Sequence, residues 1–163
     1  MRIGFDAKRL FLNYTGLGNY SRTLVSNLQR FYPQHEYHLY TTKTTRNKDT
    51  EEFFDTSKYT IHECHYSLKS YWRSYSIVEN LKNDGIDIYH GLSAEIPFGI
   101  DKSGIKTVVT IHDLIFKFFK KDYTLIDRML YNMKTKYACN HADKIIAISK
   151  RTKDDILSIY GID

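Results

Sequence analysis

The feature that most limits the fold of this chain is the alternation of short apolar segments with longer amphipathic ones. Apolar, often β-branched segments predict strands at residues 2–6, 36–42, 59–65, 86–90, 106–112 and 144–148. Apolar residues at helical spacing predict helices at 19–31, 70–83, 125–141 and 151–160, with a short one at 51–55. Strands that are connected through helices pair in parallel. We therefore predict an α/β fold, a doubly wound and mostly parallel sheet with helices on both faces.

The length of 163 residues is enough for one well-filled domain, so we predict a single domain over residues 1–163. The last residues of the chain follow a helix directly, and no closing strand comes after it. This ending predicts that a further part of the fold should follow.

The cysteines and the N-terminus bear on where the protein works. Cys64 and Cys139 lie far apart and lack the spacing of a disulfide framework, so we expect two reduced, buried thiols. The N-terminus has no apolar leader region, and no run of roughly 18 apolar residues occurs that would predict a spanning helix. These features predict a cytoplasmic protein and leave peripheral attachment to the inner face of the membrane open.

The net positive charge of the chain bears on which kinds of partner it could bind. A formal net charge of +5 suits an anionic ligand or an acidic membrane surface, although ordinary solvated lysines give the same count. An excess of this size does not by itself indicate nucleic acid, and we expect none as a partner. The many tyrosines, 14 in all, are common on surfaces that bind sugars, which is weak evidence alone.

A glycine pair lies between the first predicted strand and the first predicted helix. Gly16, Leu17 and Gly18 open that helix, where unpaired backbone N–H groups and the helix dipole favour an anion such as a phosphate. The pair begins about ten residues after the strand, too late for the tight turn of a dinucleotide site, and serine stands at position 21 where a third glycine would be. The sequence therefore disfavours an oxidoreductase and leaves phosphate contact or a plain structural turn.

Histidines end two of the predicted strands. Ligands in this class of fold bind beyond the carboxyl ends of the strands, where His112 and Asp113 follow the fifth strand. An imidazole there can bind a hydroxyl or exchange a proton near neutral pH. The alternative is a turn in which Asp113 holds the backbone. His90 gives a weaker version of the same signal, and Asp6 and Lys8 either line this edge or form a loop salt bridge.

Two other kinds of site find little support. Residues 62–65, His-Glu-Cys-His, do not share one face of a strand, and they lack the H-E-x-x-H pattern of a zinc helix, so we expect no metal site. No serine lies in a G-x-S-x-G nucleophile elbow. Residues 115–121, IFKFFKK, combine rings and lysines in the way that contact with anionic lipid requires, and residues 67–73 offer a second such stretch. Rings turned into the core under solvated lysines explain the same residues equally well.

Four blocks of sequence carry a resemblance to a known family. In order they are GLGNYSR, IDIYHGLSAEIP, KTVVTIHDLIF and ADKIIAISKRTKDDI, followed by YGID. The chain resembles, over its whole length, the N-terminal domain of a GT-B glycosyltransferase of family 4, the retaining mannosyl- and glucosyltransferase-like group. The resemblance implies a Rossmann-like domain that mainly receives the acceptor. It also implies a second, C-terminal domain that holds the nucleotide of the donor sugar and is absent from this chain, so the fragment alone should be inactive.

The resemblance also implies roles for individual residues. Gly16, Leu17 and Gly18 would bring backbone amides to the donor diphosphate. His112 would contact the transferred sugar, with Asp113 as the second candidate catalytic residue. The acceptor side would be lined by Tyr20, Ser93 and Glu95.

The function implied is transfer of a hexose, such as mannose or glucose, from a nucleotide sugar to a glycan or lipid-linked acceptor with retention of configuration. The donor would be GDP- or UDP-linked, and neither a metal nor any other cofactor would be required. The alternative is a non-catalytic Rossmann-like module that binds sugar, lipid or another protein.

Overall fold

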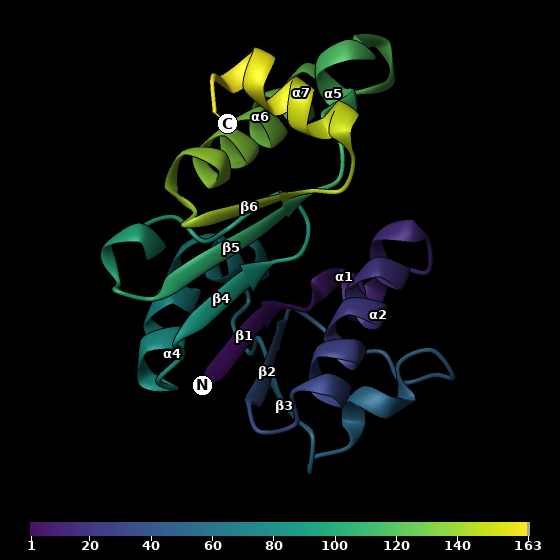
Figure 1. Ribbon diagram of the computed structural model, residues 1–163, viewed down its shortest axis with the longest axis vertical. Coiled ribbons are helices and arrows are strands. Elements are labelled where there is room, and N and C mark those ends of the chain that lie inside the picture. The colour runs from purple at the N-terminus through teal and green to yellow at the C-terminus, as the bar shows by residue number, and fades with distance from the viewer. Residues whose placement is uncertain (163) are drawn as a thin grey trace.

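The computed structural model describes residues 1–162 and contains one six-stranded sheet in the order β3-β2-β1-β4-β5-β6 (Figure 1). Every pair of neighbouring strands is parallel, so the predicted mostly parallel sheet is wholly parallel. The strands are β1 (Arg2–Asp6), β2 (Glu36–Thr41), β3 (Tyr59–Glu63), β4 (Ile88–Gly91), β5 (Lys106–Ile111) and β6 (Lys144–Ala147). Residue 163, the last of the predicted domain, lies outside the described residues.

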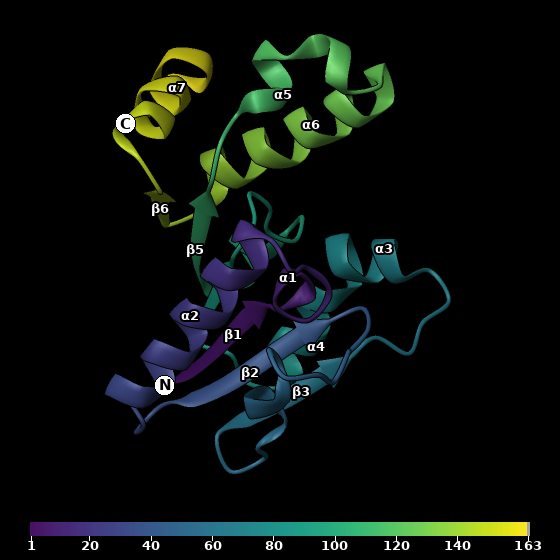
Figure 2. The same cartoon turned by 90° about the vertical axis from the view of Figure 1, so that its right-hand side faces the viewer.

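Helices cover both faces of the sheet, as predicted (Figures 1 and 2). On one face, α2 (Gly16–Phe31) and the short η1 (Glu51–Phe54) pack over β1, β2 and β3. On the other face lie α4 (Ile77–Asn83) and α6 (Leu125–His141), and α7 (Lys150–Tyr160) packs against α6 beside β6. Each face therefore has its own apolar core.

The two cores follow from the alternation of side chains along the strands. Phe5 and Leu39 point to the α2 side, where they meet Val25 and other fully buried side chains. Val109 and Ile111 point to the α4 and α6 side. Cys64 and Cys139 are free and buried there, which confirms the prediction for the thiols.

Four helical regions differ from the sequence prediction. The stretch after β1, predicted to be a loop, contains α1 (Lys8–Leu12), because Leu10 and Phe11 are buried in the α2-side core. Within the stretch 115–121, for which no helix was predicted, lies α5 (Ile115–Phe118), followed by η4 (Lys120–Asp122). The predicted helix at 70–83 consists of α3 (Lys69–Tyr71), a π-helical turn η2 (Trp72–Ser76) and α4. A last short segment, η3 (Ile100–Lys102), precedes β5.

Among the described residues, no helix combines the length and the apolar character that crossing a bilayer requires.

Candidate functional site

The candidate site lies at the carboxyl ends of β1, β4 and β5. β1 and β4 are neighbours at the centre of the sheet, where the strand order reverses direction (Figure 1). Such a point leaves a crevice outside the strand ends, and ligands of α/β sheets bind there. The start of α2, the loop after β4 and the residues after β5 all reach this edge.

The glycine pair lies inside the first turn of α2, and the two glycines differ in surroundings. A Cβ atom at Gly18 would lie 1.7 Å from the Asn13 carbonyl oxygen, and the Gly18 N–H donates to Asn13 Oδ1 at 3.0 Å. Gly18 is therefore needed for close packing of the preceding loop, and its amide is already bonded, contrary to the role expected for it. A Cβ at Gly16 would meet no atom within 4 Å. Within the described residues, the Gly16 and Leu17 amides have no hydrogen-bond partner.

Tyr20 and His112 are brought together by α2 and the end of β5. Their rings meet edge to face, with centroids 4.9 Å apart and an interplanar angle of 90°. Tyr20 lies one turn of helix beyond Gly16, since a turn holds 3.6 residues. The start of α2 and His112 therefore share one rim of the sheet.

The His112 side chain has a fixed orientation. β5 ends at Ile111, one residue earlier than predicted, so His112 begins the loop. Its Nε2 lies 2.9 Å from the Leu92 carbonyl oxygen. Because a carbonyl only accepts, Nε2 carries the hydrogen, and in the neutral ring Nδ1 is the acceptor left for another group. On the backbone side, the Thr152 hydroxyl donates to the His112 carbonyl at 3.0 Å.

A polar layer supports this ring pair from beneath. The Tyr20 hydroxyl lies 3.0 Å from Thr110 Oγ1, which lies 2.9 Å from His90 Nε2. Burial lowers the pKa of His90 to about 4, so this imidazole is neutral at physiological pH. His90 thus supports the site from below and does not line its surface. Sequence reasoning missed Thr110, whose only signal is a polar residue within an apolar strand.

The loop after β4 holds the Leu92 carbonyl toward His112. Ala94 has a φ of +58°, a left-handed conformation that is uncommon for a residue other than glycine, and its N–H donates to the Thr110 carbonyl at 2.9 Å. A Cβ at Gly91 would lie 2.1 Å from the Glu95 carbonyl oxygen, so only glycine allows the loop to fold back this tightly. Ser93, half-buried, lies in this loop.

Glu95 is bound into a buried ionic cluster. The centre of the cluster is Arg73 of η2, whose side chain is 8% exposed and forms ion pairs with both Asp6 and Glu95. The Arg73 Nε–H donates to Asp6 Oδ1 at 3.0 Å, and Lys134 Nζ lies 2.7 Å from the second carboxylate oxygen of Glu95. Glu95 is therefore paired within the protein, contrary to the expectation that it lines the acceptor side. For Asp6 the sequence left a loop salt bridge open as one alternative, and Asp6 does form a salt bridge, but with Arg73 of η2.

The pKa values in the cluster follow from burial and pairing. Burial alone would raise the pKa of Glu95, but Arg73 and Lys134 outweigh it and hold that pKa below its usual range. Burial would lower the pKa of Arg73, but Asp6 and Glu95 raise it further above its ordinary value. Burial and the Arg73 charge lower the pKa of Lys8 nearby.

Arg73 was missed at the sequence level, although one signal was present. It stands four residues before Ile77, which stands four before Leu81, and both of these are buried. Residues four apart share one face of a helix, so the spacing places Arg73 on the inward face. The π-helical turn Trp72–Ser76 contains it, a rare geometry that occurs often at functional sites.

Asp113 lies at the surface and shapes a turn. Its Oδ1 accepts the Ile115 N–H at 3.1 Å just before α5 begins. This is the alternative that the sequence left open. A catalytic role for Asp113 has no support from this contact.

Residues 115–121 divide between core and surface. Phe116 is 7% exposed, whereas Phe118 and Phe119 are 50% and 59% exposed. In residues 67–73, Trp72 and Arg73 are buried, whereas Leu68 and Tyr71 are 71% and 57% exposed, so this stretch too divides between core and surface.

His62 lies in β3, where its ring stacks on Tyr40 and its Nε2 lies 3.0 Å from His38 Nδ1. Across residues 1–162, no three or more His, Cys, Asp or Glu side chains gather in a way that could hold a metal ion.

Comparison with known proteins gives a consistent assignment. The sequence model of Glycosyltransferase Family 4 matches residues 14–163. A crystal structure of a glycosyltransferase from Rickettsia africae is similar with a TM-score of 0.55 and 15% identity, covering 99% of this chain and 40% of that one. The apo lipopolysaccharide outer core galactosyltransferase WaaB is similar with a TM-score of 0.54 and 17% identity, covering 100% of this chain and 43% of that one. These structures support the fold. No curated protein matches the sequence significantly.

Proposed function

Because the chain belongs to glycosyltransferase family 4, we propose that it is the acceptor-side domain of a retaining enzyme that transfers a hexose, such as mannose or glucose, from a GDP- or UDP-linked sugar to a glycan or lipid-linked acceptor. The chain spans only 40% and 43% of the two similar solved structures. In this proposal a second domain of the enzyme faces the carboxyl edge of the sheet and grips the nucleotide, and the 163 residues alone do not turn over substrate. The enzyme would be cytoplasmic, with peripheral attachment to the inner face of the membrane left open.

The observation that carries the proposal is the fixed His112 ring beside the start of α2. The His112 Nε2–H donates to the Leu92 carbonyl, and the Tyr20 and His112 rings pack edge to face. These two contacts orient Nδ1 before a ligand arrives. A hydroxyl of the donor sugar would donate to this Nδ1. Preorganised polar groups of this kind stabilise a transition state without the cost of reorganising when the reaction occurs.

The donor diphosphate would meet the first turn of α2. The Gly16 and Leu17 amides are the two N–H groups available there, because Asn13 occupies the amide of Gly18. The positive end of the helix dipole adds to their attraction for an anion. Charge that develops on the diphosphate as the glycosidic bond breaks would be stabilised by these amides and by cations of the second domain. The proposal requires no metal or other cofactor besides the nucleotide-sugar substrate.

The acceptor would approach past the loop after β4. Ser93 is the predicted acceptor residue that remains for this role, together with the exposed part of Tyr20. Glu95 acts differently in this proposal: tied to Arg73 and Lys134, it fixes the loop that presents the Leu92 carbonyl to His112. Glu95 and Arg73 are positioning residues.

The test is replacement of His112 in the full-length enzyme. We expect His112→Ala to lower kcat for hexose transfer by about a hundredfold, as removal of one preorganised transition-state contact does in other enzymes. His141→Ala is the matched control, because His141 is exposed at the C-terminal end of α6. This replacement should leave kcat unchanged. Equal kcat values for His112→Ala and the wild type would remove His112 from the mechanism.

A further inference from the structure

The first half of α6 is unusual because it is apolar on the side that faces away from the protein. Its second half packs on the sheet through Thr135, Ala138 and Cys139. Its first half presents Leu125, Ile126 and Met129, which are 73%, 77% and 73% exposed. Counted from Leu125, these residues and the exposed Leu130 and Met133 follow by one, four, five and eight positions. Such spacings place side chains on one broad face of a helix.

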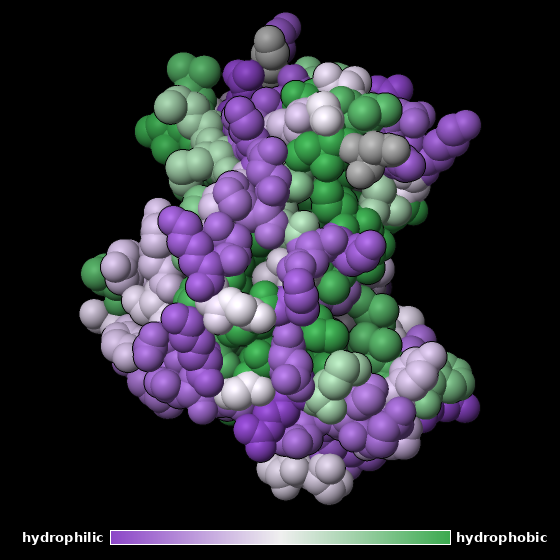
Figure 3. Space-filling model, turned by 60° about the vertical axis from the view of Figure 1, so that its left-hand side comes forward, coloured by the Kyte–Doolittle hydropathy of each residue, from purple (hydrophilic) through white to green (hydrophobic). Residues whose placement is uncertain are grey.

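The segment that precedes α6 enlarges the exposed face. Phe118 and Phe119 of the α5–η4 region are 50% and 59% exposed. We call the combined set the α5–α6 surface: Phe118, Phe119, Leu125, Ile126, Met129 and Met133. Figure 3 shows apolar side chains gathered at the upper end of the molecule, which α5, α6 and α7 form, with hydrophilic ones beside them. Contiguous apolar surface of this kind on a water-facing element marks an interaction site.

Positive charge is concentrated in the same segment. Residues 115–136 contain six lysines and arginines against two aspartates, a net charge of +4, whereas the whole chain carries +5. The remainder of the protein is thus nearly neutral. Basic residues beside an exposed apolar face complement a surface that is both anionic and apolar beneath, which describes a bilayer with anionic headgroups.

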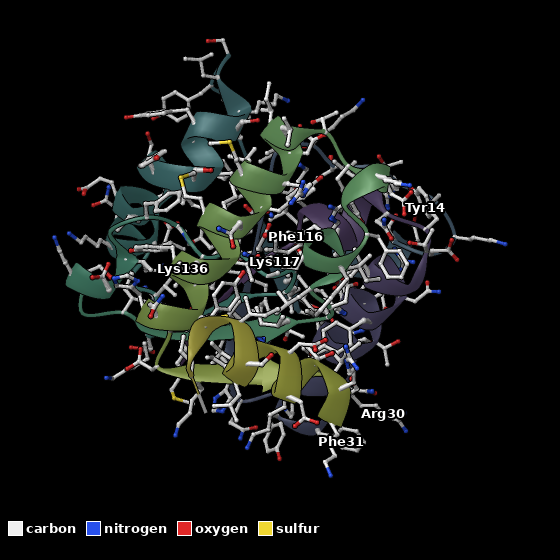
Figure 4. All side chains as sticks on the ribbon, turned by 90° about the horizontal axis from the view of Figure 1, so that it is seen from above. Tyr14, Arg30, Phe31, Phe116, Lys117 and Lys136 are labelled. Atoms are coloured by element: carbon white, nitrogen blue, oxygen red, sulfur yellow. The ribbon has the colours of Figure 1, made fainter. Side chains whose placement is uncertain are left out.

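The cations border the apolar face in a definite arrangement. Lys136 is exposed and follows Met129 by seven residues, which places both on the same side of α6, and Lys117 of α5 lies near it (Figure 4). Lys121 of η4 is exposed as well, two residues after Phe119. Burial lowers the pKa of Lys117, and the nearby charges of Lys136 and Arg128 lower it further. Arg128 Nε is buried and has no hydrogen-bond partner in the described part of the chain.

We propose that the α5–α6 surface docks on a bilayer that carries anionic lipid, with its apolar side chains at the acyl boundary and the exposed Lys121 and Lys136 at the headgroup phosphates. α5 follows the carboxyl end of β5, which bears His112, so docking brings the candidate site to the membrane. Only this consequence, access to a lipid-linked acceptor, rests on the proposed function. The docking itself follows from exposure and charge.

The experiment is co-sedimentation of the 163-residue chain with vesicles, which needs no nucleotide sugar and therefore stands or falls independently of transfer activity. We expect binding to vesicles of phosphatidylcholine with phosphatidylglycerol, and at least about tenfold weaker binding to phosphatidylcholine alone. The double variant Ile126→Glu/Met129→Glu should weaken binding by about tenfold or more, because two apolar side chains lose their burial. The variant Lys121→Gln/Lys136→Gln should remove most of the preference for anionic lipid.

Phe31→Glu is the matched control. Phe31 is 66% exposed at the far end of α2, outside the α5–α6 surface, and its replacement should leave vesicle binding unchanged (Figure 4). Circular dichroism of each variant verifies that it is folded. No binding of the folded wild type, or equal losses for Phe31→Glu and the α6 double variant, would overturn the proposal. Sedimentation velocity gives a second way to overturn it: a dimer that Ile126→Glu/Met129→Glu dissociates would assign the surface to a second copy of the chain.

Discussion

Two regions near the carboxyl edge of the sheet distribute charged and apolar side chains in opposite ways. Around Arg73, three further charged side chains from β1, the loop after β4 and α6 are paired with one another, and the arginine itself is 8% exposed. On the α5–α6 surface, large apolar side chains such as Ile126, 77% exposed, face water. Burying charges costs stability unless they are paired, and a large apolar side chain left in water contributes none.

The two regions differ in what completes them. Every charge of the Arg73 cluster already has its partner in the protein, so the cluster fixes the loops of the site relative to one another. On the α5–α6 surface, Arg151 lies over the Phe118 ring, but side chains such as Leu125, Ile126 and Met129 remain more than 70% exposed among the described residues. We therefore expect substitutions in the Arg73 cluster to change the stability of the fold, and substitutions on the α5–α6 surface to change binding.

The largest effect is expected from breaking the cluster. Arg73→Met should lower the free energy of unfolding by about 3–5 kcal/mol, because it leaves Asp6 and Glu95 buried without their partner. Urea denaturation measures the change. Arg151→Met is the matched control: Arg151 is 76% exposed and pairs with Asp155 one helix turn away, so about 0.5 kcal/mol or less should be lost. Equal losses for the two variants would contradict the assignment of Arg73 to a buried cluster.

The pH dependence of stability should come next. The pKa of Glu95 is depressed in the folded protein, so its contribution is present above the unfolded pKa, about 4.3, and is lost as pH falls through the folded value. The free energy of unfolding should therefore decrease from neutral pH into the acid range, and Glu95→Gln should flatten that slope. Glu79→Gln, at an exposed position of α4, is the control and should keep it. An unchanged slope in Glu95→Gln would contradict the pairing.

The two glycines in the first turn of α2 show a similar contrast, because Gly18 is packed against the preceding loop and Gly16 is exposed. Gly18→Ala should cost about 1–3 kcal/mol of unfolding free energy, since its methyl group would overlap the Asn13 carbonyl. Gly16→Ala should stabilise the chain by about 0.5–1 kcal/mol, because alanine is favoured in a helix and nothing lies within 4 Å. Thermal or urea unfolding of this pair measures both signs. Destabilisation by Gly16→Ala equal to that by Gly18→Ala would contradict the difference in packing.

The smallest effect is expected on the α5–α6 surface. Ile126→Ser should change the free energy of unfolding by less than about 0.5 kcal/mol, because the side chain is already in water. Ile77→Ser, at a position 1% exposed, is the matched comparison and should cost about 2–5 kcal/mol. Urea denaturation of both variants measures the difference. A loss above about 2 kcal/mol in Ile126→Ser would show that Ile126 packs inside the protein.

The strands and the main helices could be predicted from sequence because their apolar patterns are local. The run 106–112 is nearly all apolar or β-branched, as a strand buried on both faces requires, and all of it except His112 forms β5. α1 was missed because its five residues are too few to show a period, and it is stabilised by the burial of Leu10 and Phe11. Local pattern therefore predicts long elements better than short ones that depend on tertiary packing.

The site was predictable in position and less so in the state of its residues. The rule for parallel sheets brought His112 and the start of α2 to one edge, and Tyr20 joins them there. The pairing of Glu95 with Arg73 joins residues 22 positions apart in sequence through the fold, and no local pattern encodes it. Likewise, the bond from the Gly18 amide to Asn13 depends on the path of the intervening loop.

The most direct test of the central claim is a crystal structure of the full-length enzyme with an intact nucleotide sugar. The account predicts a sugar hydroxyl within about 2.6–3.2 Å of His112 Nδ1 and diphosphate oxygens facing the Gly16 and Leu17 amides. A donor bound elsewhere, with His112 Nδ1 and both amides in contact with solvent, would contradict it.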